Sequence, residues 1–141
     1  MVKEQSLYIV RNEIPGEREA KKEMKDIIKG FARYLKHQGL KPVSIDEYVR
    51  AVRMLSEYLG KTGKAFNEVR YKDALNFIHS LTLKETNGRN YSRKTINYKI
   101  SYLRRFYIYL VTSGLALENP FNNIDRLKEE DRITRAVMDV K

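Results

Sequence analysis

The chain has 141 residues, of which 42% are hydrophobic and 33% are charged, a composition typical of one globular domain and not of a disordered chain. Its 28 lysines and arginines against 18 acidic residues give a formal net charge of +10, which favours polyanionic partners such as nucleic acid or an acidic membrane surface. The absence of cysteine excludes disulfides, thiolate catalysis and the common zinc sites.

The N-terminal region carries few structural signals. Residues 1–16 include one short segment with strand propensity, at residues 6–10, and are predicted to form a flexible N-terminal arm or tail. They contain no apolar block that would make a signal peptide, and no apolar run of the chain approaches the roughly 20 residues of a membrane span. We therefore expect a cytoplasmic protein without membrane contact.

The first predicted helix spans residues 17–38. Its apolar residues recur at the spacing of one helix face, and Gly39 follows as a stop signal. The other positions are rich in lysine, arginine and glutamate, as on a solvated face. The face predicted to be buried consists of Met24, Ile27, Ile28, Phe31, Tyr34 and Leu35.

The second predicted helix spans residues 44–59. Ser44 and Glu47 have the spacing of a capping box, and Gly60 and Gly63 are expected to break the chain. The outer side of this helix carries charges of both signs, which on its own favours a solvated face over a binding surface. These outer charges are Asp46, Glu47, Arg50, Arg53 and Glu57.

The third predicted helix is shorter and spans residues 71–81. A polar loop over residues 83–90 follows it, with a turn signal at Asn87 and Gly88. The residues predicted to point inward from this helix are Ala74, Leu75, Ile78 and Leu81.

The fourth predicted helix spans residues 92–113, with Ser92 as N-cap and Gly114 as C-terminal stop. At 100° per residue one stripe is apolar and should pack against the other helices: Ile96, Ile100, Leu103, Tyr107 and Leu110. The opposite stripe is made of residues that can donate hydrogen bonds to a phosphate or a base edge: Lys94, Tyr98, Ser101 and Arg105, with Asn97, Tyr102 and Arg104 on its shoulders.

The charge of the fourth helix is one-sided. From Thr86 to Leu117 the sequence has no acidic residue and six basic ones. A helix that only needs solubility usually mixes signs, because opposite charges four residues apart stabilise it. Uncompensated positive charge, together with the free backbone N–H groups of the first helical turn, predicts contact with nucleic acid on this face.

No catalytic or metal-binding motif is present. The two histidines, His37 and His79, have neither HExxH nor HxxxH spacing, and the chain has no P-loop, GxGxxG or GxSxG motif. We therefore expect a binding module without metal, cofactor or small-molecule substrate, and not a complete enzyme.

Several motifs follow one another in a recognisable order. S-I-D-E-Y-x6-L-x-x-Y-L begins at Ser44, D-A-L-x-F-I-x-x-L at Asp73, and S-R-K-T-I-N-x-x-I-S-x-L-R-R-F-Y-x-Y-L at Ser92; G-L and N-P follow at Gly114 and Asn119. This order resembles the N-terminal core-binding, or SAM-like, domain of tyrosine recombinases, which include phage-type integrases and Xer-type resolvases. The resemblance covers about residues 20–124, and it is carried by the order and spacing of motifs that are degenerate singly.

The resemblance implies an all-α fold, a compact bundle of four to five helices that forms half of a clamp around double-stranded DNA. It also implies that the second and fourth helices face the major groove, and that the first helix can contact other recombinase protomers. The residues that the resemblance and the helical wheel together offer for DNA binding are Ser44, Arg50, Arg53, Arg93, Lys94, Thr95, Asn97, Tyr98, Ser101 and Arg105.

The resemblance stops before the catalytic part of such enzymes. The tyrosine nucleophile and its arginine, lysine and histidine assistants belong to a separate C-terminal domain, and no HxxR motif occurs here. We expect residues 17–124 to form the core-binding domain and residues 125–141 to be a linker toward an absent catalytic domain, as in a fragment of a longer recombinase. The alternatives are a helical protein–protein interaction module with a basic face and, less well supported by the loop lengths, a helix-turn-helix regulator.

Overall fold

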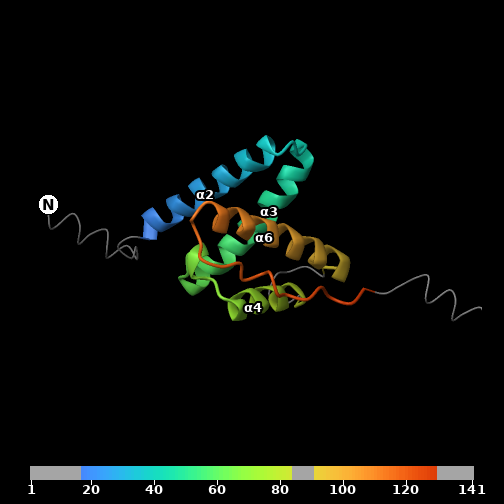
Figure 1. The fold of residues 1–141 in the computed structure, drawn as a ribbon. Helices are drawn as coiled ribbons and strands as arrows, with labels where there is room; N and C mark the ends of the chain where they lie inside the picture. The colour runs from blue at the N-terminus through green and yellow to red at the C-terminus, as the bar shows by residue number, and fades with distance from the viewer. Residues whose placement is uncertain (1–16, 84–90, 130–141) are drawn as a thin grey trace, which may run out of the picture.

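The computed structural model describes residues 17–83 and 91–129, and this part of the chain contains helices and loops but no strand. The predicted all-α fold is confirmed. The predicted arm over residues 1–16, the turn at Asn87 and Gly88, and residues 130–141 lie outside the described residues. The helices, labelled as in Figure 1, are α2 (Glu17–His37), α3 (Pro42–Thr62), the short 3₁₀ helix η1 (Phe66–Glu68), α4 (Tyr71–Leu81) and α6 (Arg93–Thr112).

Helix α3 begins earlier and ends later than predicted. Lys41 is the N-cap, and its side chain makes no capping hydrogen bond. Pro42 occupies the first turn, where the fixed φ of proline suits the start of a helix. The predicted capping box of Ser44 and Glu47 is therefore wrong. The helix also continues through Gly60 to Thr62. Gly63 follows as its C-cap with a left-handed φ of 76°.

The residues predicted to begin and end α6, Ser92 as N-cap and Gly114 as C-terminal stop, are confirmed. The Ser92 hydroxyl oxygen accepts the Thr95 backbone N–H at 3.1 Å, which satisfies one of the free donors of the first turn. Gly114 follows the helix with a φ of 75°, a conformation that glycine adopts without strain. The helix therefore begins and ends where the sequence signals indicate.

Helix α6 lies at the centre of the fold, with α2 above it, α4 below it and α3 crossing it (Figure 1). The ring of Phe106 in α6 packs edge-on against two other rings. Its centroid lies 5.0 Å from that of Phe31 in α2 and 4.9 Å from that of Phe66 in η1. The apolar stripe predicted for α6 is confirmed as buried: Ile96, Ile100, Leu103, Tyr107 and Leu110.

The buried faces predicted for α2 and α4 differ in how well they match the structure. The face of α2 is confirmed at Ile28, Phe31 and Leu35, which are buried. In α4 the inward position predicted for Leu75 is wrong, because Leu75 is 44% exposed and Phe77 is buried. Phe77 packs edge-on against Tyr58 of α3 at 5.3 Å, so the larger ring, and not the leucine, fills the space between α4 and α3.

Tyr107 is a structural tyrosine. It is fully buried, and its hydroxyl donates to the Phe66 carbonyl oxygen at 2.8 Å. Burial raises the pKa of this phenol far above its ordinary value. The Tyr107 hydroxyl therefore stays neutral, and its hydrogen bond to Phe66 links α6 to η1.

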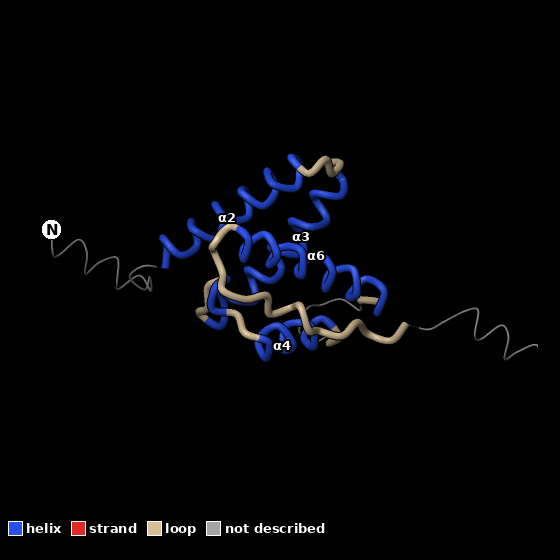
Figure 2. The backbone as a smooth tube through the Cα atoms, viewed as in Figure 1, coloured by secondary structure: helices blue, strands red, loops and turns tan. Residues whose placement is uncertain are grey.

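After α6 the chain turns back and runs beside it, as the tan loop in Figure 2 shows. We call residues 119–129 the strap. Arg104 donates to the carbonyl oxygens of Phe121 at 3.3 Å and Ile124 at 3.0 Å, and Arg93 donates to that of Lys128 at 2.8 Å. Because numbers on the strap rise as numbers on α6 fall, the two segments are antiparallel.

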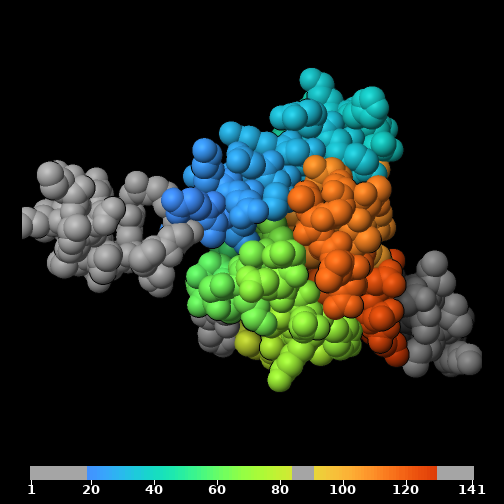
Figure 3. All heavy atoms as spheres, turned by 60° about the vertical axis from the view of Figure 1, so that its left-hand side comes forward, coloured from blue at the N-terminus to red at the C-terminus, as the bar shows by residue number. Residues whose placement is uncertain are grey.

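The strap is part of the packed structure. Phe121 and Ile124 are buried and Leu127 packs against the core, and burying side chains of this size stabilises a fold by about 2 kcal/mol each. In Figure 3 the orange atoms at the end of α6 and in the strap lie directly against the blue α2 and the green α4. The domain boundary was expected near residue 124, but contact with the domain continues to Glu129.

The connection between α3 and α4 is fastened by an ion pair. The Lys64 ammonium lies 2.9 Å from Oδ1 and 2.8 Å from Oδ2 of Asp73, and Oδ2 also accepts the Arg70 backbone N–H at 3.0 Å. The hydrogen bond from Lys64 and then that from Arg70 hold the pKa of Asp73 below its ordinary value of 3.8.

We predict that Asp73→Asn lowers the free energy of unfolding by about 1 kcal/mol at neutral pH. Since the pKa of Asp73 is lowered by folding, its contribution is complete above pH 3.8 and is lost as the pH falls through the folded value. Urea unfolding at a series of pH values should therefore show the variant and the wild type converging in acid. A difference that stays constant down to low pH, or an equal loss in the exposed control Asp26→Asn, would contradict this assignment.

Candidate nucleic-acid interface

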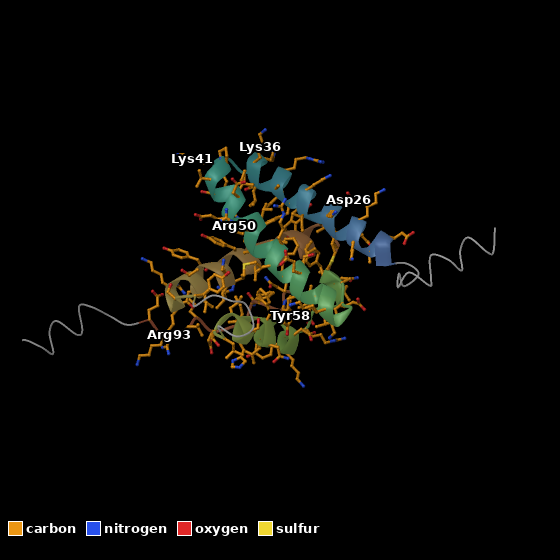
Figure 4. All side chains as sticks on the ribbon, turned by 180° about the vertical axis from the view of Figure 1, so that it is seen from behind. Asp26, Lys36, Lys41, Arg50, Tyr58 and Arg93 are labelled. Atoms are coloured by element: carbon orange, nitrogen blue, oxygen red, sulfur yellow. The ribbon has the colours of Figure 1, made fainter. Side chains whose placement is uncertain are left out.

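A shallow hollow lies where the first half of α3 passes the first half of α6, and we call it the α3/α6 hollow. It brings together Arg50, Thr95 and Tyr98, three residues predicted for DNA binding from separate parts of the sequence. Figure 4 labels Arg50 on α3 and Arg93 at the start of α6. The lining consists of Glu47, Arg50, Thr95, Tyr98, Lys99 and Tyr102.

Most of the other predicted site residues have surface exposure. In α3, Arg50 and Arg53 are exposed and Ser44 is partly exposed. In α6 the exposed residues are Arg93, Lys94 and Tyr98, and the partly exposed ones are Thr95, Ser101 and Arg105. Arg93 and Lys94 lie beside Lys128 and Glu129 of the strap, at the start of α6, and not in the α3/α6 hollow. Whether the predicted site residues contact DNA stays a prediction.

Three tyrosines join α3 and α6 at the α3/α6 hollow. The Tyr48 and Tyr102 rings lie 4.5 Å apart, and Tyr98, one turn before Tyr102 in α6, stacks 6.2 Å from it with an interplanar angle of 18°. Tyr48 also packs edge-on against Phe31 in the core at 6.1 Å. Aromatic pairs of this kind contribute about 0.5–1.5 kcal/mol beyond their buried area, so the hollow has a rigid wall.

Arg105 is held by the same wall. Its guanidinium carbon lies 5.5 Å from the Tyr48 ring centroid, within the range of a cation–π contact. Its Nη1 also donates to the Tyr48 hydroxyl oxygen at 3.3 Å. The planar guanidinium has further N–H donors that this contact does not use. Tyr48 therefore holds the Arg105 side chain in place and leaves donors for another partner.

Glu47 and Tyr102 form a polar pair across the hollow. The Tyr102 hydroxyl donates to Oε2 of Glu47 at 2.9 Å. Burial first, and then the hydrogen bond to Glu47, raise the pKa of Tyr102 to about 12. The phenol therefore remains protonated at neutral pH and keeps its role as donor.

The outward position predicted for Asn97 is wrong. Asn97 is fully buried, its Oδ1 accepts the Leu127 backbone N–H at 2.6 Å, and its Nδ2 donates to the Leu127 carbonyl oxygen at 2.8 Å. Nδ2 also donates to Oε2 of Glu129 at 3.0 Å. The amide group is thus fully engaged by the strap, and a buried group with all its partners inside the protein is not available to DNA.

Two other polar residues of α6 point to the strap as well. Arg93, Asn97 and Arg104 are spaced by four and seven residues, which places them on one line along the helix. This line borders the apolar stripe, and all three residues bind backbone groups of the strap. A polar line beside an apolar stripe was a signal that could have indicated a packed backbone segment there.

Three lining residues of the α3/α6 hollow were not among the predicted site residues: Glu47, Lys99 and Tyr102. Tyr102 follows Tyr98 by one helical turn, so the wheel placed it only on the shoulder of the polar stripe. Glu47 lies between Ser44 and Arg50 on α3, a spacing that shares one face. Its role is visible only from its tertiary contact with Tyr102.

The described residues offer neither a metal centre nor a membrane-spanning helix. Among them, no group of three or more histidine, cysteine, aspartate or glutamate side chains could hold a metal ion. No helix of residues 17–83 and 91–129 is long and apolar enough to cross a membrane.

Helices α2, α3 and α4 pack around the central helix α6, and this arrangement defines an all-α, SAM-like domain. Residues 28–114 match the family described as phage integrase, N-terminal SAM-like domain. Because this match covers more than half of the chain, the protein belongs to that family, and the resemblance inferred from the motifs is confirmed.

The chain is similar to several curated recombinases over part of their length. It is 33% identical to the tyrosine recombinase XerC of Bacillus subtilis (strain 168) over 114 residues, which cover 79% of this chain and 36% of that protein. It is 31% identical to a tyrosine recombinase of Thermosipho africanus over 117 residues, which cover 82% of this chain and 39% of that protein. The chain thus spans well under half the length of these relatives.

The fold also resembles a solved structure, the integrase from mycobacterium phage Brujita. The TM-score is 0.60 at 18% sequence identity, over 75% of this chain and 33% of that chain. At this level of identity the likeness concerns the fold alone. It supports the arrangement of helices that presents the α3/α6 hollow.

We predict that Asn97→Ala lowers the free energy of unfolding by about 2 kcal/mol, because the Leu127 backbone groups lose buried partners. The strap should then detach and become a site of cleavage by proteases. Urea unfolding and limited proteolysis of the full chain measure the two effects. The exposed Asn76→Ala in α4 is the matched control; equal protease resistance of the strap in both variants would show that Asn97 does not hold it.

Proposed function

We propose that this chain is the DNA-binding, core-site-binding domain of a site-specific tyrosine recombinase or integrase that acts in DNA integration and recombination. The observation that carries the proposal is the placement of α6. Its apolar stripe is buried, and its acid-free outer side joins α3 in forming the α3/α6 hollow. Membership of the phage integrase SAM-like family and similarity to tyrosine recombinases support duplex DNA as the ligand.

The proposed interface combines two kinds of contact. Lysines and arginines neutralise phosphates and release counterions, which supplies affinity without sequence information. Hydroxyl and aromatic groups at the α3/α6 hollow can reach base edges in the major groove, which is wide enough to admit a helix. The interface consists of Ser44, Arg50, Arg53, Arg93, Lys94, Thr95, Tyr98, Ser101 and Arg105, with Asn97 removed from the predicted set because it is buried.

In this proposal the chain positions DNA and does no chemistry itself. Strand cleavage and rejoining would belong to a separate catalytic domain, in keeping with the partial coverage of the relatives' length. The domain would act in the cytoplasm, beside other recombinase protomers on the same DNA. The charged outer surface of α2 is the surface we assign to contact between protomers.

We predict that the full chain binds duplex DNA at low salt with micromolar to millimolar affinity. Each phosphate neutralised should contribute about −0.9 to the slope of log affinity against log salt concentration. Fluorescence titration of a labelled duplex at several salt concentrations measures this slope. Absence of binding, or binding indifferent to salt, would refute the proposal and favour a protein–protein interaction module with a basic face.

We predict that Lys94→Ala and Arg105→Ala each weaken duplex binding by about 1 kcal/mol or more, and that Lys94→Ala reduces the salt slope by about 1. The matched control is Lys72→Ala, an exposed lysine of α4 that belongs neither to the α3/α6 hollow nor to the α2 surface assigned to protomer contact. Thermal unfolding checks that Arg105→Ala, which loses its contact with Tyr48, remains folded. Affinities equal to that of the control in both variants would remove α6 from the interface.

A further inference from the structure

Glu47 is the one acidic residue among those lining the α3/α6 hollow. A carboxylate at a surface that meets phosphates lowers affinity through like-charge repulsion. No cation of the described residues forms an ion pair with Glu47, whose hydrogen-bond partner there is the neutral hydroxyl of Tyr102. Pairing of charges therefore does not account for an acid at this position.

The geometry around Glu47 fixes it in place. Oε2 accepts the Tyr102 hydroxyl, Tyr102 is packed on Tyr48, and Tyr48 is packed against Phe31 of the core. A carboxylate has about four lone-pair positions on its two oxygens. The contact with Tyr102 uses one of them and restrains the carboxylate, and Glu47 is exposed in the lining of the hollow, so Oε1 can accept a hydrogen bond from a ligand there.

We propose that Glu47 is a specificity-determining residue, whose Oε1 accepts a hydrogen bond from the N4 amino group of a cytosine in the major groove. This inference rests on the proposed function, because it assigns one base contact within the same interface. Tyr102 acts as a positioning residue that aims the carboxylate. Arg50, one turn further along α3, lies in the same hollow and supplies the phosphate contact that holds the helix against the groove.

The chemistry of the base edges selects cytosine. Guanine presents only acceptors, N7 and O6, and thymine presents the acceptor O4 and a methyl group. These edges repel a carboxylate or leave it without a partner. Adenine offers an N6 amino donor, but its N7 acceptor lies beside it and opposes the second carboxylate oxygen. Cytosine offers its amino group without an adjacent acceptor on the same base.

Glu47 would also act against the wrong sites. Specificity is a difference between two affinities, and an acid that repels unmatched DNA enlarges this difference even as it lowers affinity in general. A basic surface without Glu47 would hold any duplex through its phosphates. With Glu47 in the hollow, only a duplex with an amino group at the right position compensates for the carboxylate.

The test is selection from a pool of duplexes with a randomised segment, carried out at low salt with the full chain as wild type and as Glu47→Gln. The wild type should enrich cytosine at one position of the selected site. The glutamine can still accept from Tyr102 but also donates, and glutamine pairs with the N6 and N7 groups of adenine. In the variant, preference for cytosine over adenine at that position should fall by about tenfold or reverse, since the loss of one base contact changes affinity by about that factor or more.

The control is Glu57→Gln, which makes the same change of charge at an exposed position further along α3. It should keep the cytosine preference, and Tyr102→Phe should weaken it by freeing the carboxylate. If the wild type shows salt-dependent binding but no cytosine preference, or if Glu47→Gln selects the same bases as the wild type, the inference fails and the proposed function stands. If the wild type retains no duplex from the pool, both fail.

Discussion

The burial of one face of α6 is the constraint on which the rest of the structure depends. The buried stripe from Ile96 to Leu110 belongs to the helix that both α3 and α4 contact, and Phe106 of the same helix joins α2 to η1 through its ring contacts. A helix with a full apolar face in a close-packed interior has little freedom to rotate about its axis. Its remaining faces are therefore presented in fixed directions.

Each of these faces has its own neighbour. One edge faces the strap, where Arg93, Asn97 and Arg104 bind backbone groups. The other edge faces α3, where Tyr102 contacts Tyr48 and Glu47. The stripe between these edges, together with the α3/α6 hollow beside it, is left for an external ligand. The polar residues of α6 thus divide into a structural set and a set available for binding, although their amino-acid types overlap.

Sequence reasoning found the features that depend on one helix alone. The periodicity of α6 located its buried stripe, and Ser92 marked its start, because both signals arise within a few residues of each other. It failed locally at Ser44, where Pro42 already starts the helix, and its other errors arose where the partner is distant in the sequence. Asn97 was predicted to face outward because a helical wheel cannot represent the strap, a segment outside the helix. Glu47 was not predicted as a site residue because its hydrogen-bond partner Tyr102 is 55 residues away. Leu75 was predicted inward in place of Phe77, because the packing of Phe77 against Tyr58 of α3 is not visible in the sequence of α4 alone.

The same division changes what the positive charge of α6 means. Of the basic residues in this helix, Arg93 and Arg104 donate to carbonyl oxygens of the strap, and Lys99 lies over the Tyr91 ring at 5.1 Å. Lys94 and Arg105 are on the stripe that faces outward, and Arg105 is steadied by Tyr48. The charge count of the segment therefore includes cations that also hold the strap or an aromatic ring, as well as cations that face outward. Cations supply affinity without sequence information, so base reading at this interface depends on the hydroxyl and carboxylate groups that aromatic packing holds in place.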